Sequence, residues 1–260
     1  DAKKFVIHQV WSGEMEEDSI IPFVPYLRAQ AQKSLEFYSD YVVLNGDTVT
    51  AGTGNINSVD AAPASNEPYL AFDGIRKAAL VSGTGTSMIP AGGAGLLAFA
   101  DLINVRALMN DAARFVNWGK PSNPTDLIYV TDTATADAIA LLTELKTYIN
   151  NYNNATVLNG EQVRIGKNPL LWTPVMATKY DTAGKLAITT PANNVRGSVI
   201  AFNRNGFKVG WRRRVKIATE QLVGRDQMRL IYSLRMGFGR FSATGAASGI
   251  KAAAAIYNAV

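Results

Sequence analysis

The sequence predicts an α+β fold built from a long helix, a long two-stranded β-ribbon and a mixed α/β middle domain. Residues 22–43 repeat apolar side chains at helical spacing, and residues 207–238 alternate apolar and polar side chains with period two. The segment between them mixes short helical and strand-like stretches. A helix of that length spans about 33 Å, which a compact enzyme seldom needs. We therefore expect a protein whose long elements contact neighbouring molecules.

The N-terminal segment predicts a strand followed by the long helix. Residues 3–12 are rich in strand formers, and residues 14–18 are acidic, which favours a helix start because negative charge suits the positive end of the helix dipole. The expected inward face of the helix carries Val24, Leu27, Ala31, Leu35 and Tyr38. The expected outward face carries Arg28, Gln32, Lys33, Glu36 and Asp40. Gly46 supplies a stop signal.

The middle of the chain predicts short elements separated by connectors. Residues 45–68 are rich in Gly, Asn, Thr, Ser, Ala and Pro, and residues 82–95 hold five glycines, so both are expected as loops. The expected helices are 72–80, 96–116 and one that begins at Thr133. The expected strands are 127–130, 175–178 and 197–202.

The long ribbon is expected to bury one face, because its apolar side chains keep strict alternation. The first strand places them at odd positions: Phe207, Val209, Trp211, Val215 and Ile217. After a loop at 220–226, the second strand places them at even positions: Met228, Leu230, Tyr232, Leu234, Met236 and Phe238. The opposite positions are strongly basic: Lys208, Arg212, Arg214, Lys216, Arg229 and Arg235.

Composition excludes several classes of protein. There is no cysteine, which rules out disulfides and thiolate metal sites, and no run of about 18 uncharged apolar residues that would predict a membrane span. With 47% hydrophobic residues the chain can bury the core of one large domain or two. The net charge of +5 permits a polyanionic partner without requiring one. The chain opens on Asp1 rather than Met, so a processed or incomplete N-terminus is expected.

No group of residues predicts catalysis. Residues 83–87 invite comparison with a phosphate loop but lack the lysine before the Ser or Thr, and residues 92–95 follow no convincing strand, so plain loops are favoured. His8 is the one histidine and lies in a strand-like segment, where packing or an interface is the favoured role. The run 212–214 alternates between two faces of a strand, so it is not a one-sided phosphate clamp. A solvated face or intersubunit salt bridges are favoured over nucleic-acid contact.

The order of these pieces resembles the major capsid proteins of tailed bacteriophages, the Hong Kong 97-type fold. The matching pieces are the strand 4–12, the acidic stretch 14–18, the spine helix 22–43 with its Leu44-Asn45-Gly46-Asp47 ending, an α/β axial domain and the long peripheral strands. The segment from Val215-Lys216-Ile217 through Arg225-Asp226-Gln227-Met228-Arg229-Leu230 to Leu234-Arg235-Met236-Gly237 resembles the C-terminal strand pair of the family. Residues 249–255 resemble the strand that returns to the axial domain.

The resemblance implies an organisation in five segments. Residues 1–17 would be the returning part of an extended loop, 18–68 a peripheral domain with the spine helix, and 69–200 the axial domain. Residues 201–248 would be the long strands of the peripheral domain, and 249–260 the C-terminal strand that returns to the axial domain.

The resemblance also implies a structural protein and not an enzyme. Copies would form hexamers and pentamers of an icosahedral shell, assembled in the host cytoplasm, that encloses double-stranded DNA without sequence specificity. Portal and decoration proteins would be further partners; no membrane, cofactor, metal or catalytic residue is expected. The candidate intersubunit contacts are Lys3, Lys4, Glu16, Glu17, Arg28, Arg212, Arg214, Arg229 and Arg235.

Two departures from the family stand out. Against the resemblance, the N-terminal arm and the outgoing strand of the extended loop are expected to be missing. In members that crosslink covalently, a strand Asn and a nearby Glu react with a neighbour's Lys. Here Asp226 lies near the expected Asn position, and residues 229–237 contain no Glu. Crosslinking is therefore not expected.

Three alternatives remain open from the sequence. An encapsulin-like nanocompartment would share the fold and enclose proteins in place of nucleic acid. A basic nucleic-acid-binding module would form a small oligomer with steeply salt-dependent affinity. An α/β hydrolase is disfavoured, because no nucleophile, base and orienting group stand out.

Overall fold

The structure is a computed structural model that describes residues 2–17, 23–81, 86–88, 96–109, 118–144, 157–158, 161–162, 164–165, 168–177, 179–241 and 251–259. The chain divides into two compact units. Unit 1 comprises Asp1–Asp40 and Val209–Phe238, and unit 2 comprises Tyr41–Lys208 and Gly239–Val260.

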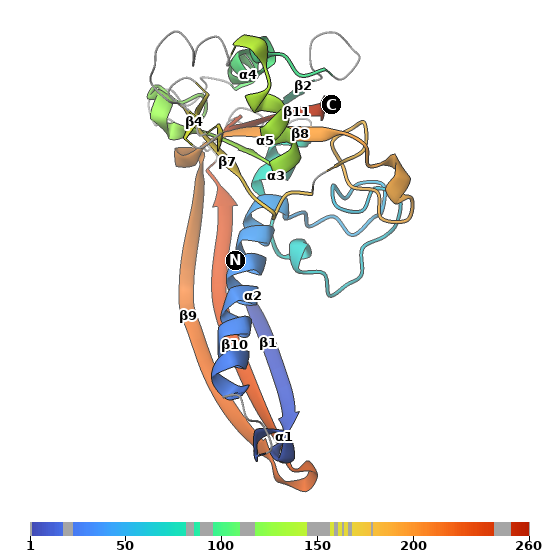
Figure 1. Cartoon of the computed structure of the whole chain (residues 1–260), viewed down its shortest axis with the longest axis vertical. Coiled ribbons are helices and arrows are strands. Elements are labelled where there is room, and N and C mark those ends of the chain that lie inside the picture. Colours follow the sequence, from blue (N-terminus) through green and yellow to red (C-terminus); the bar gives the residue numbers. More distant parts are fainter. Residues whose placement is uncertain are drawn as a thin grey trace. The chain divides into compact units, whose positions relative to one another are not determined.

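Unit 1 combines a three-stranded sheet with a long helix (Figure 1). Its elements are β1 (Lys3–Ser12), α1 (Gly13–Glu17), α2 (Phe23–Asn45), β9 (Phe207–Leu222), the short 3-10 helix η6 (Val223–Arg225) and β10 (Gln227–Arg240). The strand order is β1-β10-β9. Strands β1 and β10 are antiparallel, in a register that runs from Lys3 opposite Met236 to Ser12 opposite Gln227. The predicted strand 3–12, the long helix and the two ribbon strands are thus confirmed as elements.

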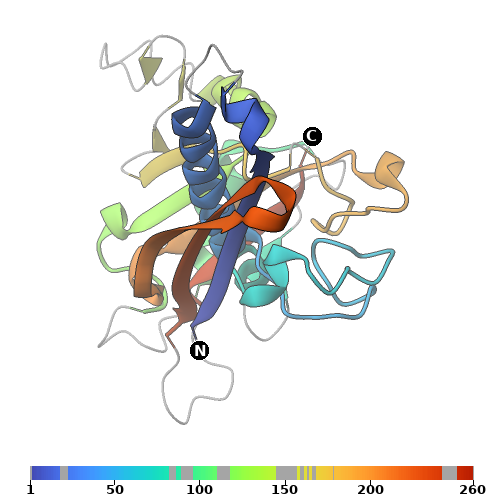
Figure 2. The same ribbon diagram turned by 90° about the horizontal axis from the view of Figure 1, so that it is seen from below.

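The core of unit 1 lies between α2 and one face of the sheet. Its buried residues come from three elements: Trp11, Ala31, Leu230 and Tyr232, with Ile7, Val24, Leu27 and Met228 packed against them. The view from below shows β1 alongside the β9–β10 hairpin (Figure 2). The predicted inward face of α2 is confirmed at Ala31 and Leu35. It is wrong at Tyr38, which is 43% exposed, because its ring lies edge-on against Phe37 in place of the sheet.

Unit 2 is a six-stranded mixed sheet with short helices. Its helical elements are η1 (Pro68–Ala71), α3 (Ile75–Leu80), α4 (Phe99–Asn104), η2 (Val105–Leu108), η3 (Pro124–Asp126), α5 (Thr133–Ala140), η4 (Pro191–Asn193) and η5 (Arg204–Gly206). The sheet strands are β2 (Thr86–Met88), β3 (Leu127–Thr131), β6 (Arg164–Ile165), β7 (Asn168–Trp172), β8 (Gly197–Asn203) and β11 (Ala253–Ala259). They follow the order β2-β11-β8-β3-β7-β6, and β4 (Val157–Leu158) pairs with β5 (Glu161–Gln162).

The centre of this sheet is buried on both faces. Strands β3 and β8 carry uninterrupted runs of buried residues, as expected for strands covered on both sides. The side chains of residues 252–255, all alanine, are completely buried beside β8. The predicted strands 127–130 and 197–202 are confirmed as β3 and β8.

Several boundaries in unit 2 differ from expectation. The strand predicted at 175–178 is wrong: residues 174–176 form a turn, in which Met176 N–H donates to the Thr173 carbonyl oxygen at 3.3 Å. The strand is β7, which ends at Trp172. The expected loop 82–95 contains β2, which pairs with β11. The expected helix 96–116 begins at Phe99 and tightens to η2, and its part at 110–117 lies outside the described residues.

The C-terminal strand and two helices also differ in extent. The strand expected at 249–255 begins at Ala253 and continues to Ala259; residues 242–250 lie outside the described part of the chain. The helix expected at 72–80 begins at Ile75, after the extended residue Gly74. The helix that begins at Thr133 is described to Ala140, and its expected continuation through Leu145 and Ile149 lies outside the described residues.

The predicted loop 45–68 lacks a helix or strand up to Pro68, and a buried carboxylate organises it. Asp47 is fully buried and accepts hydrogen bonds from the backbone N–H groups of Val49 (3.0 Å) and Ile56 (2.8 Å). Its ion pair with the Lys77 ammonium measures 2.7 Å. A Cβ on Gly46 would collide with the carbonyl oxygens of Val42 and Phe72, so only glycine fits where the chain leaves α2.

A buried arginine holds the same loop to the rest of unit 2. Arg76 is 1% exposed and donates to Asn57 Oδ1 (2.8 Å) and to the carbonyl oxygens of Ile56 (3.1 Å) and Gly184 (2.9 Å). Its guanidinium carbon lies 4.2 Å from the centre of the Tyr180 ring. Hydrogen bonds to neutral oxygens and an aromatic face thus compensate for much of the cost of burying this charge.

Replacing Leu35 by aspartate should unfold unit 1 readily, because the change removes a buried apolar side chain and buries an unpaired carboxylate. We expect a loss of at least about 3 kcal/mol in the free energy of unfolding, measured by urea denaturation. Tyr38→Asp is the matched control, since it places the same side chain in the same helix at an exposed position. It should cost about 1 kcal/mol or less. Equal losses in the two variants would contradict the assigned faces of α2.

The Asp73 carboxylate should make unit 2 sensitive to acid. Burial acts to raise its pKa, but hydrogen bonds from the Lys77 ammonium and from Thr48 outweigh that effect and hold the pKa below its usual value. The resulting stabilisation is present above the ordinary aspartate pKa of about 3.9 and disappears as the pH falls through the lower pKa of the folded state. In thermal melts, Asp73→Asn should lower Tm at pH 7, and the difference from wild type should vanish in acid. A difference that is independent of pH would contradict this account.

Candidate assembly surface

The register between β1 and β10 divides the sheet of unit 1 into two faces. Residues directly opposite one another share a face, and Ile7 opposite Tyr232 and Trp11 opposite Met228 belong to the core with α2. The intervening residues point to the other face, which we call the outer face. From β1 it comprises Lys4, Val6, His8 and Val10, and from β10 it comprises Arg229, Ile231, Ser233 and Arg235.

The outer face mixes exposed apolar and cationic side chains. Val6, Val10, Lys4, His8 and Arg235 are all exposed. Lys4 lies directly opposite Arg235, and like charges in that position repel each other. Within the described residues, neither cation is paired with a carboxylate. The folded subunit therefore presents a cationic pair that an external negative group would stabilise.

Strand β9 is an edge strand of the sheet and is exposed along its length. One side pairs with β10, and no strand in the described part of the chain pairs with the other side. The prediction of one buried face for this strand is wrong: Val209, Trp211, Val215 and Ile217 are exposed, Trp211 to 52%. The reason is that the core cluster beneath α2 draws its residues from β1, β10 and α2, so β9 lacks a covering layer.

The chemistry of β9 suits contact with another molecule. A long edge strand offers unpaired backbone N–H and C=O groups, and its exposed apolar side chains add area that another surface can bury. Its even positions carry Lys208, Arg212, Arg214 and Lys216. The repulsion between these cations opposes the pairing of two identical β9 strands and favours an acidic neighbour.

The predicted contact residues differ in how exposed they are and in whether they are already paired within the chain. Lys3, Lys4, Arg28, Arg212, Arg214 and Arg235 are all exposed in the folded chain. Arg229 is half-buried and forms an internal ion pair with Glu220 at 3.4 Å. Glu16 and Glu17 end α1, and their side chains lie outside what the structure describes.

Sequence reasoning missed other members of this surface. The unbroken alternation of 207–217 identified a strand but did not reveal that Trp211 and its apolar neighbours are uncovered. Arg213, at the centre of the basic run, donates to Ser233 Oγ at 2.8 Å and so is tied to β10. On α2, Tyr26, Phe37 and Tyr38 form an additional exposed aromatic set. The signal available in the sequence was the presence of these three aromatic residues on one amphipathic helix.

The described residues contain neither a metal-binding group nor a membrane-spanning helix. No three His, Cys, Asp or Glu side chains there lie close enough to hold a metal ion. None of the described helices is long and apolar enough to cross a membrane. At the β9–β10 turn, Asp226 adopts the left-handed conformation with φ of 45°, and its carbonyl oxygen accepts a hydrogen bond from Gly13 N–H at 2.9 Å.

Comparison with known proteins gives a result only at the level of structure. No protein-family model matches the sequence, and no curated protein matches it. Solved capsid structures match over nearly the whole chain. The capsid of a native GTA particle has a TM-score of 0.62 at 12% identity, covering 100% of this chain and 73% of that one.

Two phage structures give similar values. The acid-stable capsid of Helicobacter pylori bacteriophage KHP30 has a TM-score of 0.61 at 9% identity, covering 100% of this chain and 75% of that one. A structure from Microbacterium phage Oxtober96 has a TM-score of 0.59 at 12% identity, covering 98% and 72%. Identities this low bear on the fold alone. The long helix, the long ribbon and the α/β unit are the elements of these capsid folds, which confirms the predicted Hong Kong 97-type fold.

Proposed function

We propose that this chain is the major capsid protein of a virion, a subunit without enzymatic activity. It would assemble in the host cytoplasm into hexamers and pentamers of an icosahedral shell around double-stranded DNA. The observation that carries the proposal is a capsid fold extending over nearly the whole chain. The large apolar and cationic surface of unit 1, which the folded chain leaves uncovered, supports it.

The exposed side chains of unit 1 would supply the energy of assembly. Burying one large apolar side chain contributes about 1.5–3 kcal/mol, and β9 and α2 each offer several. Each contact between two subunits is modest, but every subunit in a closed shell would make several contacts at once. We infer that shell cohesion is noncovalent, because Asp226 lies near the position at which crosslinking relatives carry Asn.

The charge of the chain fits both kinds of proposed partner. Exposed cations on β9 and on the outer face would pair with carboxylates of neighbouring subunits. A net charge of +5 is compatible with packaged DNA, which requires charge neutralisation and no reading of bases. Portal and decoration proteins would bind to the same shell, as in capsids of this class.

Particles purified as native material should reveal the class of assembly directly. Light scattering should give a mass in the megadalton range, and nuclease treatment should leave protected double-stranded DNA inside. In hot denaturing detergent the particles should release a single band at the mass of the monomer. Shells filled with protein and free of nucleic acid would point to an encapsulin-like compartment. A stable monomer that turns over a substrate would contradict the proposal altogether.

Replacing Arg235 by glutamate should separate folding from assembly. Within the subunit the change converts the repulsion from Lys4 into attraction, which is worth about 0.2–1 kcal/mol, so Tm should stay the same or rise. If a neighbour's carboxylate pairs with Arg235 in the shell, the same variant should assemble more slowly and less completely. Lys179→Glu, an exposed charge reversal in unit 2, is the control for net charge. Unchanged assembly of the Arg235 variant across a range of salt concentrations would remove Arg235 from the interface.

A further inference from the structure

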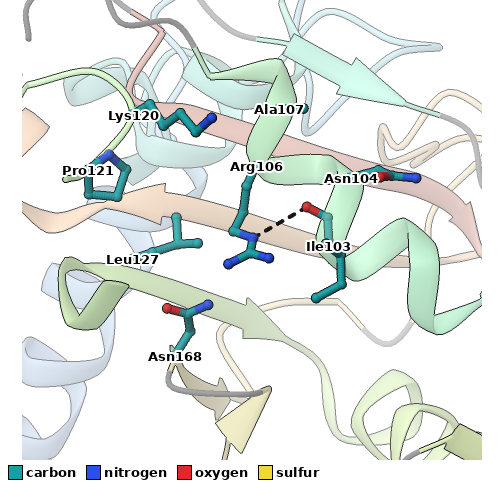
Figure 3. A pocket seen from close by; sticks show the side chains of 8 residues that line it. All are labelled: Ile103, Asn104, Arg106, Ala107, Lys120, Pro121, Leu127 and Asn168. Atoms are coloured by element: carbon teal, nitrogen blue, oxygen red, sulfur yellow. Dashed lines mark hydrogen bonds between the residues drawn. The ribbon is translucent and has the colours of Figure 1, made fainter. Parts of the chain in front are cut away.

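Unit 2 contains a pocket that has no part in the proposed assembly surface. Its volume is about 390 Å³. It lies between the helical segment of α4 and η2, which contributes Ile103, Asn104, Arg106 and Ala107, and the start of strands β3 and β7. Figure 3 shows Arg106 and Asn168 projecting toward one another from opposite sides, with Lys120 and Pro121 beside them.

The pocket is cationic. Arg106 and Lys120 both line it, and none of the described lining residues is acidic. The Arg106 Nε–H donates to the carbonyl oxygen of Ile103 at 3.3 Å, which orients the guanidinium. No described residue accepts a hydrogen bond from its two Nη groups, and none pairs with the exposed Lys120 ammonium. The pocket therefore offers several donors to an anion.

Asn168 supplies a second and independent indication of a ligand. Its side chain is 2% exposed, and its Oδ1 is buried without a hydrogen-bond partner in the described structure. A buried acceptor left unpaired costs about 1–3 kcal/mol, which a bound donor would recover.

The surroundings of Asn168 determine which way its amide points. The Tyr129 hydroxyl donates to the carbonyl oxygen of Leu102 at 2.7 Å, and burial raises the pKa of Tyr129 to about 12, so the hydroxyl stays protonated. The Asn168 side chain is hydrogen-bonded to that same hydroxyl. Because the hydroxyl proton is already engaged, the amide must donate its N–H to the Tyr129 oxygen. Oδ1 is therefore the atom left for a ligand.

We propose that this pocket binds inorganic phosphate in its singly protonated form, the hydrogen phosphate dianion. Its charged oxygens accept hydrogen bonds from Arg106 and Lys120, and its P–O–H group donates to Asn168 Oδ1. A phosphodiester lacks that O–H, so the backbone of DNA does not satisfy the site. The proposal is independent of shell formation and holds for the isolated subunit.

The test compares inorganic phosphate with sulfate on the full chain by isothermal titration calorimetry. At about pH 8 both ions are largely dianionic, and only phosphate retains a hydrogen-bond donor. Phosphate should bind at least about tenfold more tightly than sulfate, because one hydrogen bond to a buried acceptor separates them. Equal affinities for the two ions, or no binding of phosphate, would overturn the proposal.

Single substitutions test whether phosphate binds in this pocket. Lys120→Gln and Arg106→Gln should each weaken phosphate binding by about tenfold, the usual loss when a charged hydrogen bond is removed. Lys179→Gln removes an exposed lysine of the same unit outside the pocket and should leave the affinity unchanged. If the Lys179 variant loses as much affinity as the Lys120 variant, the binding is diffuse electrostatics and the assigned site is wrong. A phosphate monoester is fully deprotonated at this pH and lacks the P–O–H group, so it should compete with free phosphate no better than sulfate does. Competition as strong as that of free phosphate would overturn the assigned role of Asn168.

Discussion

A single helix packs against the three-stranded sheet of unit 1, and it is too narrow to cover all three strands. The properties of the exposed part of the sheet follow from this limit. A helix with its side chains is about 10–12 Å across, and neighbouring strands lie about 4.8 Å apart, so a single helix covers about two strands. Here these are β1 and β10, whose side chains make the core with α2. The third strand, β9, is left exposed along its length. The subunit thus folds with an uncovered apolar and cationic strand.

The arrangement of charge on that strand controls what can cover it. Exposed apolar side chains at the edge of a sheet invite indiscriminate pairing with other strands. Alternating Arg and Lys side chains oppose this among identical edges, since bringing two such strands together would place like charges side by side. A partner must therefore bring carboxylates or another anionic group. The alternating sequence of β9 thus supplies both the apolar area that attracts a partner and the cations that select an anionic one.

Unit 2 follows a different principle, because its polar groups are largely satisfied within the chain. Asp47 and Arg76 are both almost completely buried, and they hold a long loop without a helix or strand through hydrogen bonds to its backbone. The pocket at Asn168 departs from that pattern, since it keeps unpaired donors and a buried unpaired acceptor together. Arg76 Nε, Arg196 Nε and Asn258 Oδ1 are also buried without a partner in the described part of unit 2, so an unpaired atom alone does not mark a site. At Asn168 the unpaired acceptor lines the same pocket as two cations.

Local patterns of apolar residues were enough to predict the helices and strands whose extent does not depend on a pairing partner. The long helix and the two ribbon strands could be predicted, because each repeats apolar side chains at its own period. Strands β1, β3 and β8 could be predicted because each is a short run of strand-forming residues. The order of these elements was enough to indicate the fold. Boundaries that depend on pairing could not be found in this way: β7 lies before Pro174, not after it, because β3 selects residues 170–172 as its partner.

The assembly surface of unit 1 and the pocket of unit 2 could likewise be predicted only in part. The alternation of side chains along β9 and β10 identified their cations from sequence. It could not show that Arg229 is paired with Glu220 whereas Arg235 has no carboxylate partner among the described residues, or that Trp211 is exposed. The pocket joins Arg106, Lys120 and Asn168 across 62 positions of the chain (168 − 106), and no local pattern connects them. The sequence by itself determined which side chains share a face of each predicted helix or strand. Only the tertiary structure decided which faces are covered, because cover depends on how many elements pack against each sheet.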